Sequence, residues 1–405
     1  MLSSYRRLFS RPGTLAFTCY GLIGRLSFSM LGVSLLTAIV QRRHSYALAG
    51  AVSAAGMVGV AVGLPLLGRL VDRYGQRRVS IPAALFSAVP RTALPLLLHG
   101  GAPTWTLFAA ATTASVAPNL GGMSRARWAH LYGTDPALLH RANALEQALD
   151  ELCYLAGPVL GVLLCTTFFP EAGLLAISVL ATTGALLFAA QRRTEPPIAP
   201  LPQDGPRAPL RARGLPALVA VFFSTGLVFG SLEITTVAWT GTHDHRGASG
   251  LLLGLLAAGS GVSGLLFGLR PERPDPVRRL LLSLAAMTAL LLLPLTAATC
   301  DAGLGTLAVA LFVTGTGTAP TMVSGMTLVQ RVLPAGALNE GMALVVCGIV
   351  TGISAGSALG GLLAQHAPGA GGYALPVAAA ALALLTALTG TRRPRIVGSG
   401  DTAAS

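Results

Sequence analysis

The chain has 405 residues, of which 53% are hydrophobic and only 11% are charged, and its mean hydropathy is +0.67. Soluble globular domains carry roughly 25% charged residues, so this composition excludes an ordinary soluble protein and predicts a polytopic membrane protein. The net charge of +13 does not indicate nucleic-acid binding, because the arginines stand between apolar runs and no polar domain could carry a groove for nucleic acid.

Twelve apolar runs follow one another along the chain, each near the length of about 20 residues that crosses a bilayer as a helix. The first run is too long for the apolar core of a signal peptide, so we expect it to remain as the first helix. The predicted fold is an all-α polytopic membrane protein with twelve transmembrane helices. The first six cover residues 14–39, 46–68, 79–99, 103–124, 143–168 and 171–190, and the second six cover residues 216–240, 248–269, 278–299, 303–328, 338–363 and 371–390.

One long polar segment divides the chain into two halves. Residues 191–215 are rich in proline and arginine, a composition that suits a loose cytoplasmic linker. The linker separates an N-terminal six-helix bundle at residues 1–190 from a C-terminal six-helix bundle at residues 216–391. Residues 392–405 are expected to form a disordered cytoplasmic tail.

The two halves also resemble each other at an offset of about 199 residues. At that offset Met123 falls on Met322 and Gly157 falls on Gly356. Together with the matching helix order and the central linker, these pairs indicate two six-helix pseudo-repeats, with a substrate path between them at the midplane.

The arginines predict the orientation of the chain in the membrane. With the N-terminus inside, 23 of the 28 arginines fall in cytoplasmic segments and only three fall in outer loops. Basic residues are enriched in cytoplasmic loops, so both termini are expected in the cytoplasm and the protein in the cell membrane (the inner or plasma membrane). The other two arginines, Arg25 and Arg91, stand inside predicted helices.

A charged loop separates the second and third predicted helices. It reads GRLVDRYGQRR, and its charges keep it out of the bilayer while its glycines permit a tight turn. The spacing G-x-x-x-D-R-x-G-x-R-R resembles the signature loop of major facilitator superfamily transporters. The residues at its defined positions are Gly68, Asp72, Arg73, Gly75, Arg77 and Arg78.

This resemblance implies two six-helix bundles and identifies the loop as a cytoplasmic gate. We expect Asp72 to close the gate by accepting hydrogen bonds at the start of the eleventh helix, near Asn339, where the helix dipole favours an anion. The alternative is that the loop's arginines only set the orientation of the chain in the membrane and that the loop has no role in gating.

The fifth predicted helix carries a second motif. Gly157-Pro158-x-x-Gly161 resembles the GPxxG core found in exporters of the same superfamily. Proline bends a helix, and glycines at this spacing let a neighbouring helix approach closely. Generic packing of small residues is the alternative interpretation.

The fourth predicted helix departs from the drug-exporter pattern. Exporters of the resembled family commonly carry an arginine inside this helix, whereas residues 103–124 carry no charge. Arg125 and Arg127 follow at its cytoplasmic end.

Acidic residues inside apolar runs are the best candidates for transport chemistry, because each costs about 2.5 to 3.5 kcal/mol at a helix centre. The fifth helix contains three acids. Glu146 and Asp150 are four residues apart and share a face, while Glu151 points about 100° away. Glu146 lies nearest the cytoplasm, so we expect it to pair with an arginine of the gate. Asp150 and Glu151 lie deeper and could carry protons or form structural ion pairs.

Glu233 stands alone among apolar and small residues in the seventh predicted helix. We expect it to bind a proton or cation on the transport path; the alternative is a structural, hydrogen-bonded acid. Arg25 is its expected counter-charge, since the resemblance implies that the first and seventh helices line the cavity. Arg91 could pair with an acid or lie near the rim.

These patterns predict a secondary active transporter that exports a small hydrophobic or amphipathic molecule in exchange for protons by alternating access. An importer of a small polar nutrient and a non-transporting membrane sensor are the alternatives. No pair of nucleophile and base is visible, so an enzyme is not expected. The five cysteines are scattered, and no metal or cofactor is predicted. The expected partners are the lipid bilayer, the substrate and protons, with the protein as a monomer.

Overall fold

The computed structural model describes the chain except for six short stretches, and the described residues form helices, turns and bends. The described residues are 5–198, 214–243, 248–269, 275–366 and 370–390. The chain divides into two compact units: a first of Met1–Ala142 and Ala148–Ile198, and a second of Asn143–Gln147 and Ala199–Ser405. The predicted tail at 392–405 and linker residues 199–213 lie outside the described residues.

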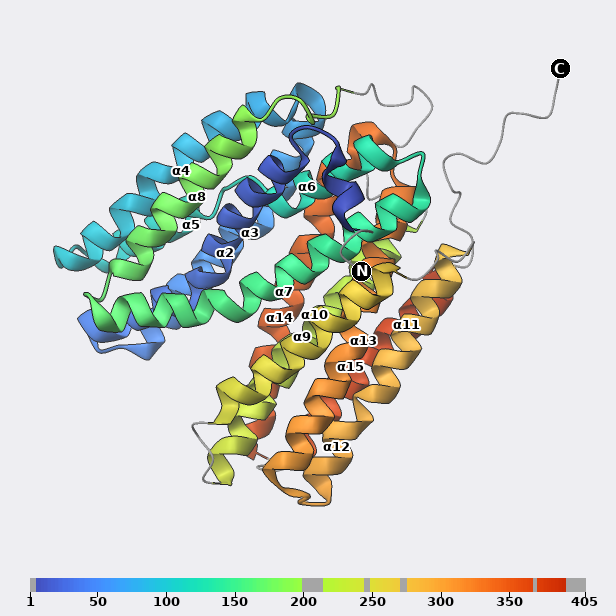
Figure 1. The fold of residues 1–405 in the computed structure, drawn as a ribbon. Helices are drawn as coiled ribbons and strands as arrows, with labels where there is room; N and C mark the ends of the chain where they lie inside the picture. Colours follow the sequence, from blue (N-terminus) through green and yellow to red (C-terminus); the bar gives the residue numbers. More distant parts are fainter. Residues whose placement is uncertain (1–4, 199–213, 244–247, 270–274, 367–369, 391–405) are drawn as a thin grey trace. The chain divides into compact units, whose positions relative to one another are not determined.

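The helices follow the order of the predicted apolar runs (Figure 1). In the first half of the chain they are η1 (Arg7–Ser10), α2 (Thr14–Arg43), α3 (Tyr46–Tyr74), α4 (Gln76–His99), α5 (Thr104–Ala114), α6 (Leu120–Tyr132), α7 (Pro136–Thr167) and α8 (Ala172–Ala190). In the second half they are α9 (Leu215–Thr242), α10 (Ser249–Leu269), α11 (Pro276–Leu290), α12 (Leu292–Thr299), α13 (Gly303–Val332), η4 (Ala335–Ala337), α14 (Leu338–His366), η5 (Ala370–Tyr373) and α15 (Ala374–Gly390).

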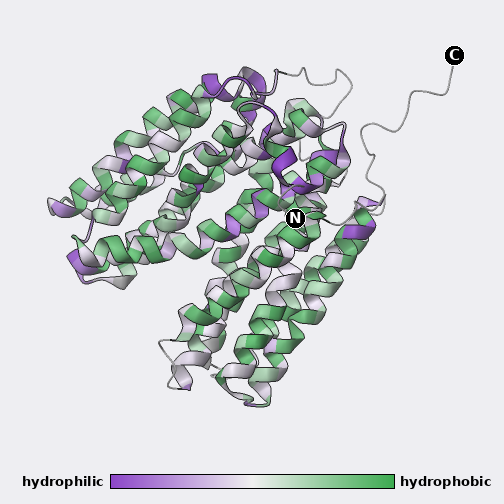
Figure 2. Cartoon of the chain, viewed as in Figure 1, coloured by the Kyte–Doolittle hydropathy of each residue, from purple (hydrophilic) through white to green (hydrophobic). Residues whose placement is uncertain are grey.

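Eleven spans in the described part of the chain are long and apolar enough to cross a membrane. Figure 2 shows hydrophobic residues along the helices and hydrophilic residues gathered near several helix ends. In hydrocarbon every backbone N–H and C=O needs an internal partner, and a helix supplies one within its own segment. This requirement explains why apolar runs of this length fold as helices.

The predicted helix at 103–124 is wrong as a continuous element. The structure places α5 and α6 there, separated by five non-helical residues at 115–119. Pro118 lacks a backbone N–H and disfavours helical backbone at the residue before it, which explains the break. Asn119 then restarts the helix, since its side chain accepts a hydrogen bond from the Gly122 N–H at 3.0 Å. Together α5 and α6 take the place of the fourth of the twelve predicted helices.

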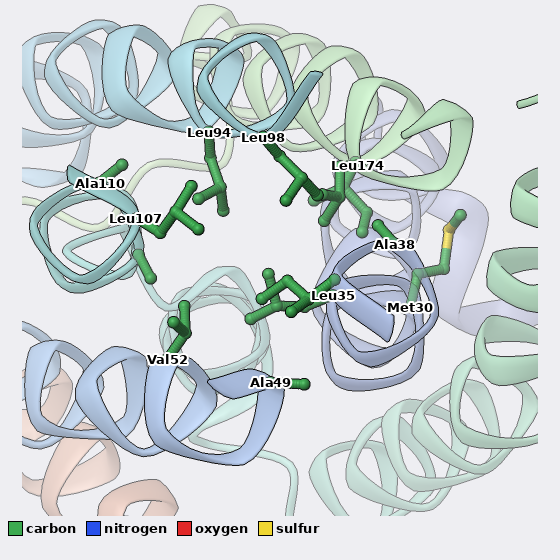
Figure 3. Packing of buried hydrophobic residues seen from close by; sticks show 13 residues of the cluster. Met30, Leu35, Ala38, Ala49, Val52, Leu94, Leu98, Leu107, Ala110 and Leu174 are labelled. Carbon is green, nitrogen blue, oxygen red and sulfur yellow. The ribbon is translucent and has the colours of Figure 1, made fainter. Parts of the chain in front are cut away.

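The first unit is built around an apolar cluster between five of its helices (Figure 3). Leucine, isoleucine, valine, methionine and alanine side chains of α2, α3, α4, α5 and α8 meet there with little or no exposure. Helix α8 packs along both α2 and α4. Because the cluster fixes α2 and α4, it also fixes the polar residues that these two helices carry at their ends.

In the second unit α9 and α14 cross at a glycine contact. A Cβ atom on Gly230 would lie 2.0 Å from the backbone oxygen of Ile353, and one on Gly352 would lie 2.1 Å from that of Phe223. No larger residue fits at this separation, so the crossing depends on these glycines.

Candidate functional site

An ion cluster joins three helices of the first unit. Asp150 on α7 accepts a hydrogen bond at its Oδ1 from Arg25 of α2 at 2.8 Å, and at its Oδ2 from Arg125 of α6 at 2.7 Å. The two arginine side chains are 10% and 5% exposed, whereas the Asp150 side chain is 32% exposed. The carboxylate therefore bridges two nearly buried cations and keeps an accessible edge.

Small residues bring α2 and α6 close enough to form this cluster. A Cβ on Gly24 would lie 2.1 Å from Leu120 Cδ1, and one on Gly21 would lie 2.8 Å from Ser124 Oγ. A Cβ on Gly121 would lie 3.3 Å from Arg25 Cδ. The contact of α2 with α6 thus depends on positions that have no side chain, and it sets Arg25 beside Arg125.

The structure gives Arg25 and Arg125 positions that sequence reasoning did not assign. Arg125 was expected at the cytoplasmic end of the fourth predicted helix; in the structure it stands within α6 and is 4% exposed. Arg25 is bonded to Asp150, whereas Glu233 was its expected partner. Glu233 belongs to the second unit, so that expected pairing stays a prediction. The sequence feature that could have indicated this position is Pro118. It interrupts the predicted helix, so that Arg125 lies inside the separate helix α6.

The predicted gate loop forms the turn between α3 and α4. Gly75 has φ +93° and ψ 153°, a backbone conformation that residues with a Cβ rarely adopt. Directly after it, the backbone N–H of Arg77 donates to Glu195 Oε1 at 2.8 Å. Glu195 lies in the predicted linker. Its carboxylate accepts from a backbone N–H at the start of α4 that has no partner within the helix.

The other gate residues differ in exposure. Asp72 is 9% exposed, and Arg73 and Arg78 are exposed. Glu146 is buried and lies in the five residues of α7 that belong to the second unit. The expected bonds of Asp72 near Asn339, and of Glu146 with the gate arginines, would join the two units and stay predictions.

Arg127 is the centre of a polar cluster beside the gate loop, and it is fully buried. Its Nε donates to Gln76 Oε1 at 2.8 Å, and its Nη2 donates to the carbonyl oxygen of Phe188 at 3.1 Å. Its Nη1 donates to the carbonyl oxygen of Gln191 at 2.9 Å and to Thr194 Oγ1 at 3.1 Å.

The same guanidinium lies over the Phe188 ring, with its carbon 4.0 Å from the ring centroid. The bonds of Arg127 to Gln191 and Thr194, and the bond between Glu195 and the Arg77 N–H, hold residues 191–198 against the helices of the first unit. A loose linker was expected here.

The Gly157-Pro158-x-x-Gly161 motif lies where α7 packs on α2. A Cβ on Gly157 would lie 2.1 Å from Ser29 Oγ, and one on Gly161 would lie 2.6 Å from Ser34 Oγ. The Ser29 hydroxyl also donates to the carbonyl oxygen of Cys153 at 2.8 Å. These contacts place α7 so that Asp150 reaches the two arginines.

Glu233 and Glu151 are both half-buried. Glu233 bonds to no other residue that the structure describes, and it stands on α9 in the second unit. An acid without a cation partner inside a membrane span is costly when it is charged.

Arg91 has a local explanation. Its Nη2 donates to the carbonyl oxygen of Ala114 at 2.8 Å, and its side chain is buried. Ala114 is the last residue of α5, where carbonyl oxygens lose their helical partners. Arg91 therefore satisfies a carbonyl oxygen that the break leaves open.

A second ion cluster, which sequence reasoning missed, lies at the C-terminal ends of α2 and α4. Arg42 donates to Glu171 from Nε at 2.6 Å and from Nη2 at 3.1 Å. His99 Nδ1 lies 3.0 Å from the same Nη2 and 3.6 Å from Glu171 Oε1. Burial alone would raise the pKa of Glu171, but the bond and charge of Arg42 outweigh burial and hold that pKa below its ordinary value. Glu171 was overlooked because it stands at a predicted helix start.

No group of three or more His, Cys, Asp or Glu side chains suited to a metal ion occurs in the described part of the chain.

Residues 17–298 match the family model of the Major Facilitator Superfamily. Among solved structures, a bacterial homologue of the iron transporter ferroportin in an outward-facing state is similar, with a TM-score of 0.71 and 15% identity, over 95% of this chain and 100% of that one. The human organic anion transporter MFSD10 gives 0.73 and 17%, over 94% and 99%. The fucose:proton symporter FucP of E. coli gives 0.68 and 13%, over 92% and 98%. No curated protein matches the chain.

Proposed function

Because the chain belongs to the major facilitator superfamily and is a multi-pass membrane transporter rather than an enzyme, we propose that it exports a small hydrophobic or amphipathic molecule in exchange for protons. The cycle is alternating access, in which the six-helix halves expose one midplane site to each side in turn. The protein works in the cell membrane with both termini in the cytoplasm.

The bridging position of Asp150 carries the proposal. A charged Asp150 attracts two guanidinium groups and holds α2 and α6 to α7. A proton on the carboxylate removes its negative charge, and the two arginines then repel each other across a neutral group. Protonation therefore favours a different arrangement of these three helices. The exposed edge of Asp150 gives the proton a way in.

Glu233 is the second proton-binding acid in this scheme. It is half-buried in α9 and bonds to no other described residue, so its charged form is costly in a membrane span. Protons that neutralise Glu233 and Asp150 from one side and leave to the other couple the gradient to the alternation of states. Glu151, one position beyond Asp150 and also half-buried, is the third candidate acid.

The test measures uptake of a panel of fluorescent amphipathic dyes into everted membrane vesicles with an imposed pH gradient. The wild-type protein is expected to accumulate at least one dye and to stop when a protonophore collapses the gradient. Asp150→Asn and Glu233→Gln are each expected to lower the driven rate at least tenfold.

Asp135→Asn is the matched control, because asparagine can still cap α7 in place of the aspartate. Driven transport that survives both Asp150→Asn and Glu233→Gln would refute the proton-carrier assignment.

Import of a small polar nutrient is the second candidate, favoured by the similarity of the fold to a fucose:proton symporter. Right-side-out vesicles distinguish the two directions. Proton-driven uptake of a sugar in that orientation, with no dye accumulation in everted vesicles, would replace export with import. Absence of transport in both orientations, with intact folded protein, would favour a sensor.

A further inference from the structure

An open apolar groove runs between α3 and α4. Its volume is about 480 Å³, and its lining is almost entirely apolar. The lining residues are Leu67, Leu70, Tyr74, Arg78, Val79, Pro82, Ala83, Phe86 and Val116. It belongs wholly to the first unit and contains neither Asp150 nor its two arginine partners.

The break between α5 and α6 shapes the floor of this groove. Val116 belongs to the non-helical residues there, and a Cβ on Gly63 of α3 would lie 3.1 Å from the Val116 Cα. The backbone of the non-helical residues therefore passes close to α3, whereas a continuous helix would have placed side chains there. On α4 the groove is lined by the small residue Ala83 and by Pro82, between the larger Val79 and Phe86.

The walls of the groove face outward. Phe86 is 58% exposed and Tyr74 is 44% exposed, and both stand on membrane-spanning helices. The Phe86 ring therefore meets lipid, whereas the Tyr74 ring, at the last residue of its span, lies at the membrane surface, where tyrosine is enriched.

One cation stands at the end of this apolar surface. Arg78 is exposed, and no residue in the described part of the chain pairs with its side chain. Arg78 and Phe86 are eight positions apart on α4, which corresponds to about 12 Å along the helix. Half of the hydrocarbon core measures about 15 Å. The groove thus combines a cation at one end with apolar walls that extend most of the depth of one leaflet.

We propose that this groove binds one anionic glycerophospholipid, with its phosphate on Arg78 and an acyl chain between α3 and α4. A free phosphate would use the arginine but not the apolar walls, and an uncharged chain would use the walls but not the arginine. The charge and the length of the groove together fit a molecule that carries both groups. The proposal does not rest on the direction or the coupling of transport.

The experiment uses the full chain, purified in detergent, and native mass spectrometry after addition of equal amounts of phosphatidylglycerol and phosphatidylcholine. The wild-type protein is expected to retain phosphatidylglycerol in preference to phosphatidylcholine. Arg78→Gln is expected to reduce the affinity for phosphatidylglycerol about fivefold, the change typical of one basic side chain at an anionic surface. Affinity for phosphatidylcholine stays within twofold.

Two variants separate the groove from general surface charge. Arg69→Gln removes an exposed arginine of α3 that does not line the groove, and it is expected to change neither affinity. Ala83→Trp fills the groove and is expected to lower retention of both lipids. If Ala83→Trp does not give a folded protein, Arg78→Gln and Arg69→Gln still decide, because both positions are exposed.

Equal losses in Arg78→Gln and Arg69→Gln would overturn the proposal, as would unchanged phosphatidylglycerol binding in Arg78→Gln. A wild-type dimer that Arg78→Gln or Ala83→Trp converts to a monomer would also overturn it, since a second copy of the chain would then occupy the groove.

Discussion

Replacing Arg127 tests whether the buried guanidinium holds the gate end of the first unit together. Arg127→Met keeps much of the length and the apolar stem of the side chain but removes the charge and every donor. The acceptors that lose a partner are Gln76 Oε1, Thr194 Oγ1 and the carbonyl oxygens of Phe188 and Gln191. They come from the start of α4, the end of α8 and the segment that follows α8.

The magnitude follows from the type of contact. A hydrogen bond to a charged group is worth about 1.5 to 3 kcal/mol, and losses within one network do not add. A buried acceptor left without a donor costs about 1 to 3 kcal/mol, so the loss of this network costs about 3 to 5 kcal/mol in all. For a domain of 150–250 residues this corresponds to a fall in Tm of roughly 6 to 20 °C. Arg127→Lys should fall between, since an ammonium cannot reproduce the planar fork of donors.

Thermal unfolding in detergent, followed by the monodisperse peak in size-exclusion chromatography, measures this loss. Arg193→Met is the matched control, because Arg193 is an exposed arginine close to Thr194, and a change there should stay within about 0.5 kcal/mol. A wild-type Tm in Arg127→Met would refute the structural role of the cluster. An equal loss in Arg193→Met would show that arginine content, rather than burial, sets the stability.

Two further predictions concern other parts of the fold. The depressed pKa of Glu171 means that its contribution to stability is complete above about pH 4.5 and is lost as the pH falls through its lower folded-state pKa. Glu171→Gln should therefore lower Tm at pH 7, and its difference from wild type should shrink as the pH falls below 4.5; a difference that does not change with pH would contradict the Arg42 pairing. Gly230→Ala should destabilise the crossing of α9 and α14 by about 1 to 3 kcal/mol. In Gly241→Ala, on the same helix, the new methyl group meets nothing within 4 Å, so this variant should be neutral. Equal Tm values for the two variants, measured from the monodisperse chromatographic peak after heating, would contradict the close packing.

The positions of the helices could be predicted because membrane length and apolar composition leave few options. The predicted span at 79–99 became Gln76–His99, and the predicted span at 171–190 became Ala172–Ala190. The start of α7 was placed seven residues too late, at 143 in place of Pro136. The sequence did carry the signal, since Asp135 caps the helix from its side chain and proline follows at the first helical position.

The candidate site could be predicted only in part. Asp150 was recognisable as a candidate because the free-energy cost of an acid in an apolar run depends only on the residue and its sequence neighbours. Its partners Arg25 and Arg125 come from two other helices, and the glycine contacts that select them depend on tertiary packing. Glu171 gave no such signal, since a carboxylate at a helix start is ordinary until its burial against Arg42 is known.

The break between α5 and α6 has a consequence for how the protein enters the membrane during synthesis. α5 has 11 residues and α6 has 13, which is about 16 Å and 20 Å of helix against a hydrocarbon thickness of about 30 Å. Neither piece can insert alone. Arg91 leaves the ribosome before Ala114, so α4 presents an unmatched cation until α5 arrives to accept its hydrogen bond. We therefore expect α4, α5 and α6 to enter the bilayer together, as one unit of insertion.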